Sequence, residues 1–200
     1  MSETTTIDLL RHGEPVGGRR YRGQIDDPLS ETGWQEMRDA VSGQRPWQAI
    51  ISSPLKRCAA FAAELSDQMD IALSYDDRLK EVGFGHWEGF SGDQLRAQDP
   101  HQMKRFYHNP IGHRPQNAEP LENFSQRVSQ AYNQAVRENS GQHILLITHA
   151  GVIRSILANL LDAPLGSMYR FSIGTASLSR IKIETERPPT IMFIGKTSLY

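Results

Sequence analysis

Short apolar runs alternate with amphipathic stretches along the chain and divide it into strands and helices. The run 7–10 contains only one polar residue and is followed at once by Gly13 and Pro15, so it predicts a strand rather than a helix. "WQAII" at 47–51 and "HILLIT" at 143–148 predict two further strands. The last of these is apolar enough to be buried on both faces of a sheet.

Apolar positions with helical spacing fill the stretches after these strands. Ser30 suits the N-cap of a helix that runs to about Val41. "SSPLKRCAAFAAELSDQM" at 52–69 predicts a helix that begins with a serine cap and has Pro54 at its first position. Cys58 lies on the apolar face of this helix, so we expect it to be a packed core residue.

A middle region rich in proline and glycine, residues 76–120, has little periodicity. We expect long connections with one or two short helices there, and such connections often carry function. Further helices are expected from Leu121 onwards and over 152–161. "SLSRIKIE" at 177–184 and "TIMFIG" at 190–195 predict a β-hairpin at one side of the sheet.

Strands that alternate with helices predict a three-layer α/β/α sandwich with a mainly parallel central sheet and a C-terminal β-hairpin. The 200 residues suit a single domain over 1–200. Lysine and arginine total 22 against 23 acidic residues, so no global basic field favours nucleic acid or an anionic membrane as partner. No apolar stretch approaches the ~20 residues that span a bilayer, and a cytoplasmic protein is expected. The single cysteine excludes an intrachain disulfide and offers no zinc-ligand spacing.

Electropositive or titratable groups follow each of the three best strands. Arg11 and His12 come directly after the first, Arg57 lies in the first turn of the helix after the second, and His149 follows the third. If these strands are parallel neighbours, the four groups meet at one edge of the sheet, where ligands bind in open α/β folds. A single histidine is more often a structural residue whose hydrogen bonds are made within the protein. The convergence of several strand ends therefore decides whether His12 and His149 are functional.

Two arginines beside helix N-termini would make an anion site, because guanidinium groups and unpaired backbone N–H groups bind phosphate oxygens. A phosphoryl group is the occupant expected there. Two histidines in such a site suggest more than binding, because an imidazole is also a nucleophile.

Five segments, in order and covering nearly the whole chain, are "LLRHGE", "DPLSETGW", "SSPLKRCAAFA", "RLKEVGFGHWEG" and "LLITHAGVIR". Together they resemble the histidine phosphatase superfamily, which also contains the cofactor-dependent phosphoglycerate mutases. The triplet RHG alone would be weak evidence for this superfamily, but its combination with the distant THAG and the SSPxxR element is specific for it. The resemblance implies a phosphoglycerate mutase-like α/β fold.

The resemblance also implies a covalent mechanism that needs no metal and no cofactor. His12 would attack phosphorus and become phosphorylated. Arg11, Arg57 and His149 would hold the three non-bridging oxygens and stabilise their charge. Glu81 matches the acid that protonates the leaving alkoxide and then assists the attacking water. Without the family pattern, Glu81 would be taken for a solvated loop carboxylate.

Some positions depart from the family pattern. Many members have an asparagine, an extra phosphate contact, where this chain has Gly18. The candidates to replace it are Arg19, Arg20 and Arg22. The expected substrate-binding residues are Arg11, Arg22, Gly23, Gln24, Arg57 and His149.

Further acidic and basic residues are expected around this set. Glu14 and Glu88 are expected to brace arginines or backbone groups. His113 and Arg114 are candidates to reach a substrate, and other loop histidines have no ligand spacing. Where relatives often have GGES, the chain has "NAEPLENFSQR", which keeps Glu119 and Arg127.

The substrate is less determined than the chemistry. The segments look most like the α-ribazole-5′-phosphate phosphatases of cobalamin biosynthesis, but broad-specificity small-molecule phosphatases share nearly all of them. A mutase is disfavoured because the mutases that the chain resembles have a longer middle region and a longer C-terminal tail. A non-catalytic phosphate-binding regulator would be suggested by an incomplete set of site residues, and none is missing. A small phosphate ester is thus the expected partner, and a homodimer stays open.

Overall fold

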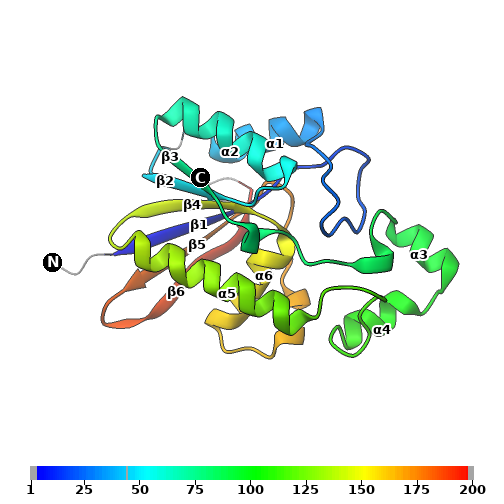
Figure 1. Cartoon of the computed structure of the whole chain (residues 1–200). Coiled ribbons are helices and arrows are strands. Elements are labelled where there is room, and N and C mark those ends of the chain that lie inside the picture. Colours follow the sequence, from blue (N-terminus) through cyan, green and yellow to red (C-terminus); the bar gives the residue numbers. More distant parts are fainter. Residues whose placement is uncertain (1–3, 44, 198–200) are drawn as a thin grey trace.

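A six-stranded sheet organises the described part of the chain, residues 4–43 and 45–197 of this computed structural model. The strands are β1 (Thr5–Arg11), β2 (Ala49–Ser52), β3 (Ala72–Tyr75), β4 (His143–Thr148), β5 (Leu178–Glu184) and β6 (Arg187–Lys196). Their order across the sheet is β3-β2-β4-β1-β5-β6 (Figure 1). The first four of these are parallel to one another, whereas β5 and β6 form an antiparallel hairpin against β1. The predicted α/β fold with a mainly parallel sheet and a C-terminal hairpin is confirmed.

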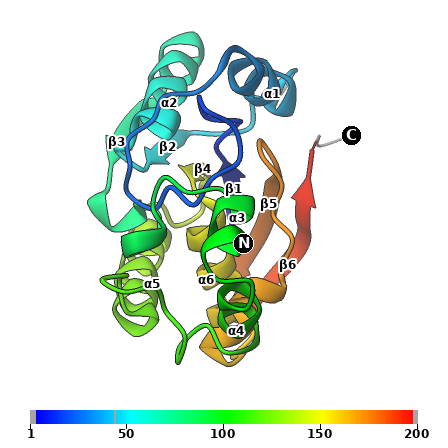
Figure 2. The same ribbon diagram turned by 90° about the vertical axis from the view of Figure 1, so that its right-hand side faces the viewer.

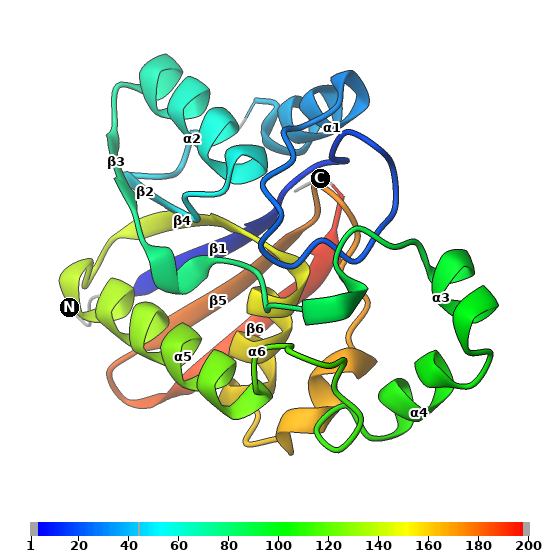
Figure 3. The same cartoon turned by 45° about the vertical axis from the view of Figure 1, so that its right-hand side comes forward.

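Helices cover both faces of this sheet. The α-helices are α1 (Glu31–Val41), α2 (Lys56–Met69), α3 (Gly92–Gln98), α4 (Gln102–His108), α5 (Leu121–Glu138) and α6 (Ala150–Leu160). Short 3-10 helices are η1 (Asp77–Leu79), η2 (Gly85–Trp87) and η3 (Leu165–Arg170). One face is covered by α1 and α2 and the other by α5 and α6 (Figure 3). Among the described residues, no helix is long and apolar enough to cross a membrane.

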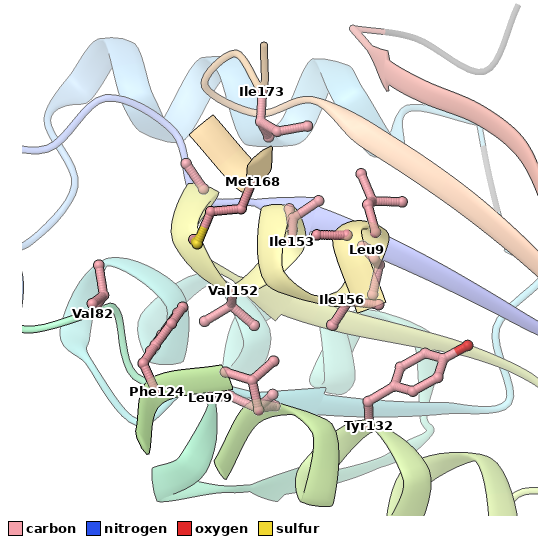
Figure 4. Packing of buried hydrophobic residues seen from close by; sticks show 14 of the residues in the cluster. Leu9, Leu79, Val82, Phe124, Tyr132, Val152, Ile153, Ile156, Met168 and Ile173 are labelled. Atoms are coloured by element: carbon pink, nitrogen blue, oxygen red, sulfur yellow. The ribbon is translucent and has the colours of Figure 1, made fainter. Parts of the chain in front are cut away.

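The alternation of side chains along β1 explains the two layers. Leu9 contacts the core beneath α5 and α6, whereas Leu10 contacts the core beneath α1 and α2. Helix α6 is apolar almost all round, and its Val152 and Ile156 pack between the sheet and Phe124 of α5 (Figure 4). The strands β1 and β4, which are followed by His12 and His149, are buried in this close-packed core. The site at their carboxyl ends therefore has a rigid base.

Two local predictions need correction. Helix α2 begins at Lys56 with Leu55 as its cap, not with a serine cap and Pro54 in the first turn. The reason is that Ser52 ends β2 and the hydroxyl of Ser53 lies 2.8 Å from a ring nitrogen of His149, so neither serine caps the helix. The strand β3 was not predicted because it is a short, largely exposed edge strand without an apolar run. Cys58 is fully buried in the core, as predicted.

The middle region contains the two short helices α3 and α4, as expected. They stand on the side of the molecule toward which the parallel strands point (Figure 2). Tyr107 of α4 joins them to the loop after β1 through a 2.7 Å hydrogen bond between its hydroxyl and that of Tyr21. The α3–α4 pair is therefore placed to form one wall of a site at the carboxyl ends of the strands.

Candidate active site

The ends of β2, β4 and β1 bring the predicted site residues together. The register pairs Arg11 with Thr148, so the residues after the two strands are neighbours. The amide of His12 donates to the carbonyl of Thr148 at 3.0 Å, and the rings of His12 and His149 meet edge-on with centroids 5.1 Å apart. The predicted convergence of the strand ends is therefore seen in the structure.

His12 is held in the state that a nucleophile requires. Its Nδ1 lies 2.7 Å from the carbonyl oxygen of Gly13, which can only accept, so Nδ1 carries the proton and Nε2 keeps its lone pair. Burial and the nearby charges of Arg11 and Arg57 hold the pKa of His12 well below its ordinary value. The ring is thus neutral at neutral pH.

His149 is buried beneath His12 and is not among the residues that line the cavity described below. Its Nε2 lies 2.8 Å from the hydroxyl of Ser53 and 3.7 Å from the sulfur of Cys58. Burial, followed by the charge of Arg57, holds the pKa of His149 well below its ordinary value. The serine and the cysteine therefore fix the orientation of a neutral ring.

Arg57 and Arg11 present guanidinium groups whose donors are only partly used. Arg57 is almost fully buried and donates to the carbonyls of Ile25 at 2.6 Å and Gly23 at 2.8 Å. Arg11 donates to the carbonyl of Ile173 at 2.7 Å, and burial lowers its pKa to about 10. The buried Nε atoms of both arginines have no partner among the described residues. Buried, unpaired cationic donors are costly unless an anion satisfies them.

Glu81 faces the same space from the connection between η1 and η2. Its carboxylate accepts from the amide of Val82 at 2.9 Å and from the amide of Gly151, in the first turn of α6, at 3.2 Å. A Cβ atom at Gly151 would lie 2.1 Å from Glu81 Oε1. The glycine of the "HAG" triplet is therefore required by the close approach of this carboxylate.

These groups open into one cavity of about 790 Å³. Arg11, His12, Arg57 and Glu81 are among the residues that line it. Other parts of its lining come from the loop 14–23, from the α3–α4 pair, from the first two turns of α6 and from the segment 172–175. In the described part of the chain, no cluster of three or more histidine, cysteine or acidic side chains is placed to hold a metal ion.

The loop after β1 brings three arginines to this cavity and holds them differently. Arg22 is buried, paired with Asp27 at 2.9 Å, and donates to a backbone carbonyl. Arg20 donates to the carbonyl of Gly17 at 3.0 Å, and the exposed Arg19 has no hydrogen-bond or ion-pair partner among the described residues. All three line the cavity, so each is placed near a ligand.

Two of the three residues expected from this loop lie at the cavity, and one does not. Arg22 and Gly23 line it, but the side chain of Gln24 is exposed and lies outside the lining. Only the backbone of Gln24 is held near the site, because its N–H donates to the carboxylate of Glu88 at 3.3 Å.

The remaining charged candidates brace the site. Glu88 accepts from the amide of Phe84 at 2.9 Å, and Glu14 accepts from the hydroxyl of Ser30 at 3.0 Å. Arg114 was a candidate to reach a substrate, but it donates to the carbonyl of Gly83 at 2.7 Å and does not line the cavity. His113 is exposed and also lies outside the lining.

Sequence reasoning missed Arg154, which lines the cavity from α6. It lies one helical turn after Ala150, which also lines the cavity. Residues four apart lie on the same face of a helix, so this spacing could have placed Arg154 beside Ala150 at the site. The segment 172–175 had no comparable signal, because it is a connection without periodicity.

A family model of the histidine phosphatase superfamily (branch 1) matches residues 7–194. The chain belongs to this superfamily. The match includes the ends of β1, β2 and β4, where the candidate site lies, and the loops between them. The expectation drawn from the five sequence segments is confirmed at this level.

Curated proteins resemble the chain along nearly its whole length. Phosphoserine phosphatase 1 of Hydrogenobacter thermophilus is 28% identical over 185 residues, which are 90% of this chain and 87% of that protein. The bifunctional protein Rv2228c of Mycobacterium tuberculosis is 28% identical over 198 residues. That alignment covers 96% of this chain but 54% of the relative, so the chain spans about half the length of that protein.

The fold is shared with solved structures. A mycobacterial glucosyl-3-phosphoglycerate phosphatase superposes with a TM-score of 0.85, covering 96% of this chain and 99% of that one. The two sequences are 23% identical, so this likeness concerns the fold. The three-layer arrangement described above is therefore the arrangement of a known phosphatase.

Proposed function

We propose that the protein is a phosphomonoesterase that hydrolyses small phosphate esters through a phosphohistidine intermediate, without a metal ion. One observation carries this proposal. His12, with its Nε2 unprotonated, lines a cavity together with Glu81 and with two arginines whose buried Nε donors are unpaired. A phosphoryl group satisfies the donors and offers the nucleophile its target.

In the first step, the lone pair of His12 Nε2 attacks phosphorus in line with the ester oxygen. The P–N bond forms as the P–O bond to the alkoxide breaks, and protonated Glu81 gives its proton to the leaving oxygen. Arg11 and Arg57 donate to the non-bridging oxygens, where the charge of the transition state is spread. His149 is proposed to add a third contact from beneath.

In the second step, water attacks phosphorus and the P–N bond breaks. The Glu81 carboxylate takes a proton from that water, which returns Glu81 to its acid form and His12 to its neutral form. Inorganic phosphate then leaves, and no proton or electron is left over. The pair His12 and Glu81 thus completes a cycle without a cofactor.

The substrate is proposed at a coarser level than the reaction. α-Ribazole 5′-phosphate stays a candidate on the sequence resemblance, but the relatives reported above are named for phosphoserine and glucosyl-3-phosphoglycerate. A broad-specificity small-molecule phosphatase fits the site equally well. The proposal therefore names small phosphate monoesters as a class.

The test is phosphate release from a panel of esters in the presence of EDTA. The panel holds α-ribazole 5′-phosphate, 3-phosphoglycerate, phosphoserine, a sugar phosphate, a nucleoside monophosphate and p-nitrophenyl phosphate. His12→Ala should abolish turnover, and His86→Ala, at an exposed histidine outside the cavity, is the matched control. Turnover that survives His12→Ala would refute the mechanism, and return of the phosphate to a second hydroxyl instead of water would identify a mutase.

A further inference from the structure

The charge of the cavity exceeds what one phosphate group requires. Seven arginines line it, at positions 11, 19, 20, 22, 57, 96 and 154, against three acidic residues, Glu14, Glu81 and Asp93. Only Arg22 and Arg96 among these arginines have an ion-pair partner in the described part of the chain. Since a phosphate monoester brings at most two negative charges, the arginines favour a ligand with a further anionic group.

Arg154 is the arginine best placed for that second group. Its Nε donates to the carbonyl of Phe171 at 2.9 Å, while Arg11 donates to the carbonyl of Ile173 at 2.7 Å. The two guanidinium groups are therefore fastened to one short segment of backbone, two residues apart. Two residues span at most about 7 Å of extended chain, so both groups lie within reach of a single small molecule.

The terminal amino groups of Arg154 are available to a ligand. Within the described residues, they have no hydrogen-bond acceptor and no carboxylate within ion-pair distance, although the guanidinium lies 5.9 Å from the ring centre of Tyr169. The positive charge of Arg154 also opposes that of Arg11 and helps to lower the pKa of Arg11. Two like charges held side by side are stabilised when an anion binds between them.

Arg154 contributes less charge at the phosphate position than the arginines around His12. After burial, the charges that lower the pKa of His12 are those of Arg11, Arg57 and Arg22. The guanidinium of Arg154 instead lies 5.9 Å from the ring centre of Tyr169 in η3, a residue outside the cavity lining. A group that reaches Arg154 therefore belongs to the organic part of the ester rather than to the phosphate.

We infer that Arg154, beside Arg11, forms a subsite for a second anionic group, so that the preferred substrates are phosphate esters with a carboxylate a few bonds from the ester oxygen. This inference rests on the proposed function and narrows its substrate class. Arg154 acts here as a specificity-determining residue, and Arg11 is shared between the phosphate and the carboxylate. A neutral alcohol in place of the carboxylate would leave the Arg154 donors unsatisfied.

Two pairs of esters that differ mainly in the carboxylate test the inference. They are phosphoserine against phosphoethanolamine, and 3-phosphoglycerate against glycerol 3-phosphate. For the wild-type chain, kcat/KM should be at least tenfold higher for the carboxylate member of each pair. In Arg154→Gln this ratio should fall to about one, through a higher KM for the carboxylate members.

The thermal midpoint of Arg154→Gln, compared with that of the wild-type chain, serves as the check that the variant folds. Arg154→Lys keeps the charge but cannot hold the Phe171 carbonyl and a carboxylate in the same fork geometry, so an intermediate ratio is expected. Arg96→Gln is the matched control, because Arg96 lines the same cavity but is paired with Asp93. It should leave the ratio unchanged.

Three results would overturn the inference while leaving phosphatase activity in place. First, the wild-type ratio could be near one. Second, Arg154→Gln could slow both members of a pair equally, as expected for the loss of a phosphate contact. Third, Arg96→Gln could lower the ratio as much as Arg154→Gln does. Failure of the proposed function is a different result, since the wild-type chain would then release phosphate from none of the esters.

Discussion

The guanidinium of Arg127 and the carboxylate of Glu119 form a two-point ion pair, with Nε to Oε1 at 2.7 Å and Nη2 to Oε2 at 2.9 Å. The other N–H groups of Arg127 donate to the backbone carbonyls of Arg78, Lys80 and Glu81, at 2.6 to 3.1 Å. All five donors of this arginine are thus used to fasten the backbone that carries the proposed proton donor Glu81.

Arg127→Lys should lower kcat at least tenfold, because a lysine cannot reproduce the planar fork and the segment that carries Glu81 would loosen. Phosphate release and the thermal midpoint would be measured together. Arg38→Lys is the control, since Arg38 forms a similar two-point pair with Glu64 on the exposed faces of α1 and α2. Unchanged kcat in Arg127→Lys would show that this bracing does not matter for the reaction.

Gly23→Ala should also reduce activity. The residue has φ of +52°, and a Cβ atom there would lie 1.9 Å from Oε1 of Glu88. Relief of this clash must shift the loop whose carbonyl accepts from Arg57 or displace the Glu88 carboxylate from the amides that it braces, so we expect kcat/KM to fall at least tenfold.

Gly43→Ala separates the effect of the Gly23 clash from the effect of backbone strain at a positive φ. Gly43 also has a positive φ, +70°, but nothing lies within 4 Å of its Cβ position, and it is remote from the cavity lining. This variant should lose about 1–2 kcal/mol of unfolding free energy and keep its kcat. Equal kinetic losses in both glycine variants would contradict the steric argument.

The convergence of Arg11, His12, Arg57 and His149 could be predicted because each follows a strand with a clear apolar run. Parallel strands in one sheet end at the same edge, so strand recognition alone placed these four residues together. The α-helices around them could be predicted for the same reason, since their apolar faces have the helical period.

The remaining features depend on contacts that no local pattern contains. The predicted start of α2 was wrong because the hydroxyl of Ser53 contacts the ring of His149, ninety-six residues away, instead of capping the helix. Gln24 was expected in the cavity, but its side chain is exposed and lies outside the lining. The helical spacing of Arg154 from Ala150 was available in the sequence, but the contact that orients its guanidinium, the carbonyl of Phe171, lies in a connection without periodicity. Such long-range partners decide where a polar side chain points.

The unfolding free energy should fall as the pH drops below about 6.5. His12 and His149 have depressed pKa values in the folded state because burial disfavours their charged forms. Below 6.5 the unfolded chain binds protons that the folded chain does not, so each histidine costs about 1.4 kcal/mol per pH unit until its folded pKa is reached. Urea unfolding at pH 7.5 and 5.5 would measure this.

His12→Gln isolates the contribution of one ring to that pH dependence. Its loss of stability between the two pH values should be smaller than that of the wild-type chain by about the share of one histidine. Equal losses in the two proteins would mean that His12 is free to bind a proton in the folded state.

In the middle of β1, Asp8 is fully buried and accepts from three side chains. Trp47 Nε1 lies at 2.8 Å, His143 Nε2 at 3.0 Å, and Arg180 donates through Nε at 2.7 Å and Nη2 at 2.9 Å. Burial acts to raise the pKa of Asp8, but the donors, led by Arg180, outweigh it and hold the pKa below its ordinary value. The carboxylate therefore stays ionised in the core.

Asp8→Asn removes that charge and leaves Arg180 without its partner, so we expect a loss of about 3–5 kcal/mol in unfolding free energy. The kcat of the folded fraction should stay within about twofold, because Asp8 does not line the cavity and acts on stability rather than on the reacting groups. Glu64→Gln, which removes the exposed partner of Arg38, should cost no more than about 1 kcal/mol in the same urea titration. If the two variants lost equal stability, the buried network around Asp8 would stabilise the fold no more than a surface ion pair does.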